Sequence, residues 1–300
     1  MREAPHSNTR TSRRTLLRAS ASAVALAGAG ALSAGCQSMP SATGGTFDPG
    51  PPADTGITHT ERVYSRARGQ DVNLVTILPK EQPPAGLPVS LLLHGRGGSA
   101  EEVTWHGWGG QLRDAVAEGK TRPFAFVSVD GGDNYWHEYP DGDDALGMLL
   151  DEIPRWLRER GLGGGDGQPW AATGVSMGGF GSLVYARRRR ERGNSPGALA
   201  VVSPALFTEW SELRSRDAFT DEAQWAAIDP LRNPGAHGDV PLGVWCGTED
   251  DRFIEGTRQF IAKADPTHAD LRPGPHGPDF FQSVVGDVLG FLTDYVPKPG

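Results

Sequence analysis

A serine between two glycines lies where an apolar run ends and a helical pattern begins. Ser176 is the centre of a Gly-x-Ser-x-Gly motif at 174–178, after the apolar run 170–175 and before the helical pattern 177–191. This layout predicts a nucleophile elbow, in which a tight strand-to-helix turn pushes the serine hydroxyl out over a sheet edge. The two glycines leave room for that turn because they carry no Cβ. Ser176 is therefore the predicted nucleophile.

A second match to the same motif surrounds Ser195, at 193–197. It joins a helical pattern to a strand pattern, which is the wrong order for an elbow. Pro196 would also remove the backbone N–H that an elbow supplies to a substrate oxygen. The context therefore favours Ser176.

A serine hydroxyl attacks only when a base takes its proton and an acid orients that base. In elbow hydrolases the chain order is Ser, then Asp or Glu, then His, each after a successive strand. Asp250 follows the strand pattern 242–245 and a turn at Gly247, so it is the predicted acid. Asp251 is the alternative acid, and otherwise it would cap the helix expected from residue 252.

The predicted base is His276, in a Gly/Pro-rich loop after the strand pattern 269–272. No other histidine follows that strand pattern, and a neutral imidazole suits general-base chemistry near pH 7. The predicted oxyanion hole combines the backbone N–H of Met177 with that of Arg96, in the glycine-rich loop 93–98. Gly95 in that loop lets the backbone approach a substrate, whereas His94 is predicted to be a structural hydrogen-bonding residue.

These segments together resemble the α/β-hydrolase superfamily. The closest resemblance is to its bacterial "putative esterase" branch, which includes S-formylglutathione hydrolases, feruloyl esterases and mycolyltransferases. The resemblance covers about residues 70–295 and rests on His94-Gly95-x-Gly97-Gly98, the Ser176 elbow, Gly247-Thr248-Glu249-Asp250 and Gly274-Pro275-His276. It implies an esterase that needs no cofactor. The branch commonly has Gly-Gly-His where this chain has Gly-Pro-His.

The alternation of short apolar runs with helical patterns independently predicts an α/β fold, with a mostly parallel sheet of the eight-stranded type and helices on both faces. The first two strands, joined near Gly69, are expected to form an edge hairpin. Residues 204–238 are predicted to be an insertion that forms a short lid. The expected strands are 62–65, 72–78, 89–93, 124–129, 170–175, 198–202, 242–245 and 269–272, and the expected helices are 109–118, 143–160, 177–191, 251–264 and 279–295.

The loop after strand 124–129 offers candidate substrate-binding residues: Asn134, Tyr135, Trp136 and His137. Aromatic side chains with polar neighbours suit a substrate wall. The alternative is that the aromatics pack the loop onto the core. The acidic cluster 141–144 lacks the length and the final Glu of a calcium loop, so no metal is predicted. Asp143 or Asp144 is expected to cap the following helix instead.

The first 35 residues are predicted to be a twin-arginine signal peptide, because Arg13-Arg14 precedes an Ala/Gly-rich, mildly apolar stretch. Cys36 follows Leu32-Ser33-Ala34-Gly35, which resembles a lipobox and predicts lipidation at Cys36. Ordinary cleavage sites at 27–31 are the alternative. Residues 36–57 are expected to be a flexible tether, and residues 58–300 the catalytic domain.

The charge of the chain excludes several partners. The net charge is −8, and removing residues 1–35, with five Arg and one Glu, makes it −12. Such a surface argues against nucleic acid, and against a membrane except through a lipid anchor. The basic run 187–190 is interpreted as the solvated end of a helix. The sequence thus predicts an exported esterase of small-molecule esters, anchored at the cell surface, periplasmic or secreted. An acyltransferase with the same residues and a non-catalytic binding module are the alternatives.

Overall fold

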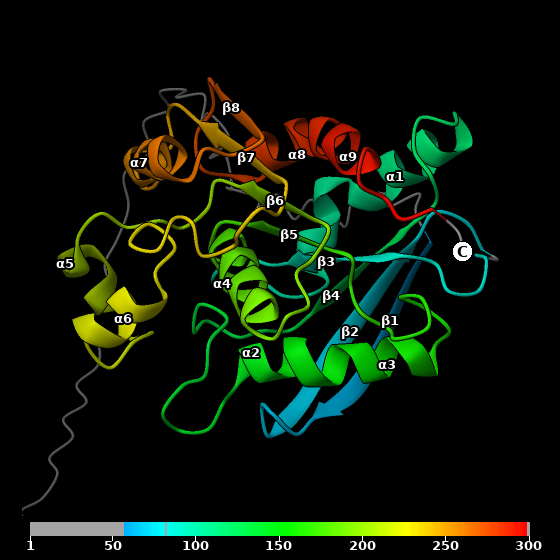
Figure 1. Cartoon of the computed structure of the whole chain (residues 1–300), viewed down its shortest axis with the longest axis horizontal. Coiled ribbons are helices and arrows are strands. Elements are labelled where there is room, and N and C mark those ends of the chain that lie inside the picture. Colours follow the sequence, from blue (N-terminus) through cyan, green and yellow to red (C-terminus); the bar gives the residue numbers. More distant parts are fainter. Residues whose placement is uncertain (1–56, 82, 299–300) are drawn as a thin grey trace, which may run out of the picture. The chain divides into compact units, whose positions relative to one another are not determined.

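The computed structural model describes residues 57–298 except residue 82. Its centre is an eight-stranded sheet in the order β1-β2-β4-β3-β5-β6-β7-β8 (Figure 1). The pairs β1–β2 and β2–β4 are antiparallel, and the other neighbours are parallel. The mostly parallel sheet and its edge hairpin confirm the predicted fold class. The strands are β1 Ile57–Ser65, β2 Gln70–Leu78, β3 Val89–Leu93, β4 Ala125–Val129, β5 Ala171–Val175, β6 Ala198–Val202, β7 Leu242–Gly247 and β8 His268–Arg272.

The central strands are apolar along their whole length because both faces of the sheet are covered. Successive strand residues point to opposite faces. Leu91 and Leu93 accordingly belong to one hydrophobic cluster, whereas Leu92 between them belongs to the other. A continuous apolar run is what a strand with two covered faces requires.

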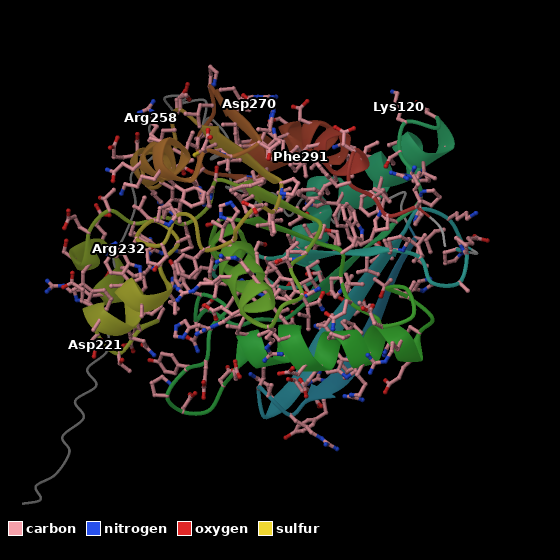
Figure 2. The ribbon with its side chains drawn as sticks, in the orientation of Figure 1. Lys120, Asp221, Arg232, Arg258, Asp270 and Phe291 are labelled. Carbon is pink, nitrogen blue, oxygen red and sulfur yellow. The ribbon has the colours of Figure 1, made fainter. Side chains whose placement is uncertain are left out.

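Different helices cover the two faces. The cluster with Leu91 includes side chains of α3 and α4, and the cluster with Leu92 includes side chains of α1, α8 and α9. Charged side chains such as Lys120, Asp221 and Arg258 point outward (Figure 2). The helical segments are η1 Glu102–His106, α1 Trp108–Ala117, α2 Ala145–Gly147, η2 Met148–Glu152, α3 Ile153–Glu159, α4 Met177–Glu191, α5 Trp210–Leu213, η3 Arg214–Arg216, α6 Glu222–Ile228, α7 Ile254–Ala264, α8 Pro278–Ser283 and α9 Val285–Thr293.

Two expected helices are interrupted. The pattern 143–160 forms α2 and α3 with a π-helical segment, η2, between them. Pro154 near the start of α3 has no N–H for the preceding turn, which suits a widened turn there. The pattern 279–295 forms α8 and α9, with Val284 between them.

The insertion 204–238 lies between β6 and β7 and contains α5, η3 and α6. It is fastened to the loop after β4, because His137 Nε2 lies 2.7 Å from the Ala218 carbonyl oxygen and the Tyr139 hydroxyl donates to the Asp217 carbonyl. None of the helices that the structure describes has the length and apolar character needed to cross a bilayer. The predicted signal peptide, Cys36 and nearly all of the tether lie outside the described residues.

Candidate active site

Ser176 lies on a strained turn between β5 and α4. Its backbone has φ 54° and ψ −118°, which a residue with a side chain rarely adopts, and its N–H donates to the Val202 carbonyl at 2.9 Å. The flanking glycines are required by space. A Cβ on Gly174 would lie 2.2 Å from the Gly178 carbonyl oxygen, and a Cβ on Gly178 would lie 2.0 Å from the Leu93 carbonyl oxygen. The motif therefore has the geometry of an elbow.

The ends of β5, β7 and β8 bring three side chains into one hydrogen-bonded line. His276 Nε2 lies 3.0 Å from Ser176 Oγ, and His276 Nδ1 lies 2.7 Å from Asp250 Oδ2. The Asp250 side chain is fully buried, so its carboxylate needs the imidazole N–H as a donor. A proton on Nδ1 leaves Nε2 as an acceptor for the serine hydroxyl, which is the arrangement that general-base chemistry needs.

Asp250, and not the alternative acid Asp251, is the carboxylate that contacts His276 in the structure. Asp250 Oδ1 accepts a hydrogen bond from the Phe253 N–H at 3.2 Å, so one carboxylate both faces His276 and caps the turn before α7. The Asp251 side chain is exposed and forms no hydrogen bond with the described residues. α7 begins at Ile254 without a side-chain cap, so Asp251 does not take the capping role that was its alternative.

Two phenylalanine rings hold the His276 imidazole from the sides. The Phe253 ring centroid lies 5.0 Å and the Phe281 centroid 5.2 Å from the imidazole centroid, both edge to face. These contacts restrict the ring to the plane in which it meets both Asp250 and Ser176.

The backbone N–H groups of Met177 and Arg96, both beside Ser176, have no acceptor among the described residues. Met177 is the first residue of α4, where the helix dipole favours negative charge. Arg96 follows Gly95, where a Cβ would lie 3.3 Å from the Ser176 Cβ. Both groups are thus available to a ligand oxygen near Ser176.

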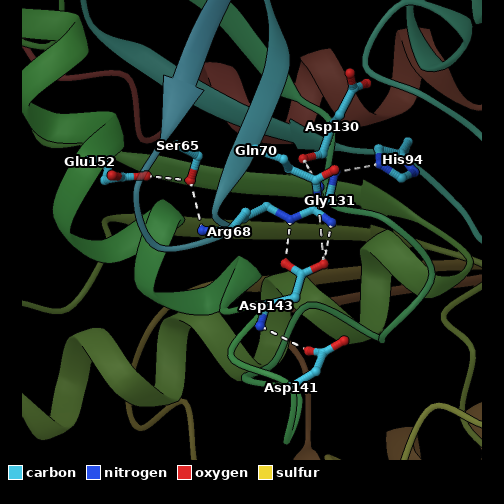
Figure 3. A network of polar contacts seen from close by, with 9 residues as sticks. All are labelled: Ser65, Arg68, Gln70, His94, Asp130, Gly131, Asp141, Asp143 and Glu152. Carbon is cyan, nitrogen blue, oxygen red and sulfur yellow. Dashed lines mark hydrogen bonds and ion pairs between the residues drawn. The ribbon is translucent and has the colours of Figure 1, made fainter.

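His94 links the loop of Arg96 to the loop after β4 (Figure 3). His94 Nε2 accepts from the Gly131 N–H at 2.9 Å, so the ring proton lies on Nδ1 and donates to the Gly95 carbonyl at 2.7 Å. Burial lowers the pKa of His94 and thereby favours this neutral form. The expectation that His94 is structural is confirmed.

A buried arginine that the sequence analysis missed supports the same loop. Arg68 donates to both carboxylate oxygens of Asp143, at 2.7 and 2.6 Å, and to the Asp130 carbonyl at 2.8 Å (Figure 3). The Asp130 carboxylate accepts from the N–H groups of Ala100 and Asn73, both at 2.9 Å. The loops after β3 and β4 are therefore fixed to each other and to the edge hairpin.

The expected helix cap is one of the two acidic residues named for it. Asp144 Oδ1 accepts from the Gly147 N–H at 2.7 Å and caps α2. Asp143 instead forms the ion pair with Arg68.

Trp136 and His137, and the Tyr135 ring, do not form the open substrate wall that the sequence suggested. Trp136 is fully buried and packs against Gly131 and Gly181, where a Cβ would lie 2.3 and 2.4 Å from its ring. Both His137 nitrogens lie within 2.7 Å of carbonyl oxygens. The Tyr135 ring is 1% exposed. The aromatics pack the loop onto the core, and Asn134 is the half-exposed member of the predicted set.

Comparison with known protein families shows which family this chain belongs to. The model of the esterase family described as "Putative esterase" matches residues 65–267. The chain belongs to this family. Two esterases of Mycobacterium tuberculosis, Esterase MT1326 of strain CDC 1551 / Oshkosh and Esterase Rv1288 of strain ATCC 25618 / H37Rv, are each 24% identical over 275 residues. The alignments cover 77% of this chain and 58% of each relative's length.

Solved structures of esterases have the same fold. A ferulic acid esterase superimposes with a TM-score of 0.65 at 18% identity, covering 80% of this chain and 99% of that one. An S-formylglutathione hydrolase from Agrobacterium tumefaciens gives a TM-score of 0.65 at 16% identity, covering 82% and 98%. FphF, a fluorophosphonate-binding serine hydrolase of Staphylococcus aureus, gives 0.60 at 16% identity, covering 79% and 98%. This protein therefore has the α/β-hydrolase fold of the esterase branch.

Proposed function

We propose that this esterase-family protein hydrolyses carboxylic esters through an acyl-enzyme on Ser176. The observation that carries the proposal is the hydrogen-bonded line from the buried Asp250 carboxylate through His276 to Ser176, with distances of 2.7 and 3.0 Å. The strained φ of Ser176 and the two free N–H groups beside it support the same mechanism.

In the first half of the reaction, Ser176 Oγ attacks the ester carbonyl carbon while His276 Nε2 takes the hydroxyl proton. The carbonyl oxygen becomes an oxyanion that accepts from the N–H groups of Met177 and Arg96. The tetrahedral intermediate then expels the alcohol, which receives the proton from His276. Asp250 stabilises the imidazolium and remains ionised throughout.

In the second half, water replaces the alcohol. His276 takes a proton from water as its oxygen attacks the acyl carbon, and a second tetrahedral intermediate forms in the same oxyanion hole. Its collapse returns the proton to Ser176 Oγ and releases the carboxylic acid. Transfer of the acyl group to another alcohol would use the same residues, with that alcohol in the place of water.

A panel of p-nitrophenyl esters with acyl chains of two to twelve carbons tests the activity. We expect Ser176-dependent hydrolysis with a preference for two to six carbons or for polar or aromatic acyl groups, because the insertion between β6 and β7 is short. A deep apolar tunnel would instead add about 0.8 kcal/mol per methylene, so rates would rise steadily with chain length. Ester release equal in wild type and Ser176→Ala would refute the proposal.

We also propose export by the twin-arginine route, followed by lipidation at Cys36. The support is the pair Arg13-Arg14 and the residues before Cys36. Replacing both arginines by lysine should leave precursor in the cytoplasm, and mass spectrometry of the mature N-terminus should find an acylated Cys36. Efficient export of the double variant would exclude dependence on this route, and a mature N-terminus at or before Gly35 would exclude lipidation.

A further inference from the structure

Two arginines close to the candidate active site have no carboxylate partner. Arg96 is exposed in the loop after β3, and Arg216 is half-buried at the end of η3, in the insertion. Neither forms an ion pair within the described part of the chain. Some other arginines form none either, such as Arg258, which is exposed, and Arg189, which donates to carbonyl groups. Arg216 is half-buried and therefore needs a separate explanation.

Two aromatic contacts connect Arg216 to the predicted base. Its guanidinium carbon lies 4.9 Å from the Phe207 ring centroid, and its Nε–H is buried without an acceptor. Phe207 packs against Phe253 at 5.1 Å, and Phe253 packs against His276 at 5.0 Å. Two rings therefore separate the Arg216 guanidinium from the imidazole.

Arg96 belongs to the loop after β3, which also contains the predicted oxyanion-hole N–H. Its neighbour Gly95 touches Ser176. The positive charges of Arg216 and Arg96 both act on the Tyr135 hydroxyl, and Arg216 is also its hydrogen-bond partner, although burial dominates and raises the pKa of Tyr135 to about 12. The two cations thus lie near one neutral hydroxyl, which cannot balance their charge.

Asp133 is the carboxylate that acts on the same hydroxyl. Its Oδ1 accepts from the Gly97 N–H, and it forms no ion pair with either arginine. These three groups are the charges that act on the Tyr135 hydroxyl, and two of them are positive. Solvent exposure accounts for Arg96, but a half-buried guanidinium without a carboxylate, such as that of Arg216, is costly unless something acidic meets it.

We propose that the natural ester carries a carboxylate, which Arg216 and Arg96 bind while Ser176 attacks the ester carbonyl. A substrate carboxylate would give Arg216 the acidic partner that it lacks, and the planar guanidinium group matches a carboxylate with paired hydrogen bonds. This inference rests on the proposed esterase function and names the class of its substrate.

Two matched pairs of esters test the inference, one for each side of the scissile bond. The acyl-side pair is mono-p-nitrophenyl adipate and its methyl-capped form. The alcohol-side pair is 4-carboxyphenyl butyrate and its methyl-capped form. The readout is the ratio of kcat/KM for the charged member to kcat/KM for the capped member, in wild type and in Arg216→Gln. Comparing the two proteins cancels differences in intrinsic reactivity.

We expect the ratio for one pair to fall about tenfold in Arg216→Gln, as hydrogen bonds to charged groups commonly contribute this much. Arg214→Gln is the control, because Arg214 is exposed on the same segment, and it should leave the ratio unchanged. Arg216→Lys keeps the charge and should keep part of the ratio, so a folding defect in the glutamine variant can be recognised. Added NaCl should lower the wild-type ratio.

The outcomes separate this inference from the proposed function. Ser176-dependent hydrolysis of all four esters, with ratios that Arg216→Gln and Arg216→Lys leave unchanged, would overturn the carboxylate site and leave the esterase intact. Equal losses in Arg214→Gln and Arg216→Gln would also overturn it, since a general surface charge would then explain the effect. Failure to hydrolyse any of these esters or the neutral panel would overturn the proposed function itself.

Discussion

Replacing Asp250 by asparagine changes one atom at the centre of the site, and the surroundings determine how the amide must lie. The Phe253 N–H needs an acceptor, so the amide oxygen takes the place of Oδ1. The amide NH₂ then replaces Oδ2, 2.7 Å from His276 Nδ1. An NH₂ group facing Nδ1 requires an unprotonated Nδ1, which moves the ring proton to Nε2. The serine hydroxyl then has no acceptor.

The expected loss is large because the wrong tautomer removes the general base. The corresponding Asp→Asn change in a serine protease lowers kcat about 10⁴-fold. At about 1.36 kcal/mol per factor of ten, that equals roughly 5.4 kcal/mol of transition-state stabilisation. We expect a loss of about 10³- to 10⁴-fold for Asp250→Asn. Asp251→Asn should stay within about twofold, because its side chain is exposed and forms no hydrogen bond with the described residues.

The assay is kcat/KM on the best short-chain p-nitrophenyl ester for wild type and both variants. Thermal unfolding of each protein serves as the control, because the amide introduced by Asp250→Asn retains the hydrogen bond from the Phe253 N–H and should cost little stability. Near wild-type turnover in Asp250→Asn, or a larger loss in Asp251→Asn, would refute the assignment of the acid and the tautomer argument together.

Three further predictions concern the surroundings of the site. His94→Phe leaves the buried Gly131 N–H without an acceptor. It should therefore lower the free energy of unfolding by about 1–3 kcal/mol and reduce kcat/KM at least tenfold. An unchanged kcat/KM would show that His94 does not position the loop. Asp143→Asn weakens a largely buried ion pair with Arg68, and urea unfolding should show a loss of about 2–3 kcal/mol, whereas no loss would refute its structural role. Cys246 is buried, and burial raises the pKa of its thiol to about 11. The thiol should therefore react with a thiol reagent at pH 8 only after the protein is unfolded. Rapid labelling of Cys246 in the native protein would contradict this.

The hydrogen-bonded line from Asp250 through His276 to Ser176 could be predicted because each member follows a strand of the sheet. The carboxyl ends of parallel strands meet at one edge of a sheet, so side chains after β5, β7 and β8 converge although they are far apart in sequence. The glycines at 174 and 178 could also be predicted. A Cβ at either position would lie about 2 Å from a backbone oxygen, so no other residue fits there. Local sequence patterns and the order of the motifs along the chain were therefore enough to predict most of the fold and the hydrogen-bonded line from Ser176 to Asp250.

The supporting contacts could not be predicted because their partners are distant and leave no local signal. Arg68 lies 75 residues from Asp143, and nothing near either residue indicates the pair. Trp136 looks the same in sequence whether it faces a substrate or fills the space above two glycines. Arg189 belongs to the basic run 187–190, which the sequence analysis interpreted as solvated, but it is buried. Its guanidinium can be buried because it donates to the Tyr185 hydroxyl and to two carbonyl groups.

The most direct test of the central claim is covalent labelling with a fluorophosphonate. This reagent reacts with an activated serine, and intact mass followed by peptide mapping locates the adduct. The account predicts one adduct per chain, on the peptide containing Ser176, lost in Ser176→Ala and strongly slowed in Asp250→Asn. A stoichiometric adduct on another residue, or ester hydrolysis by a protein that the reagent neither labels nor inhibits, would contradict the claim that Ser176 is the nucleophile.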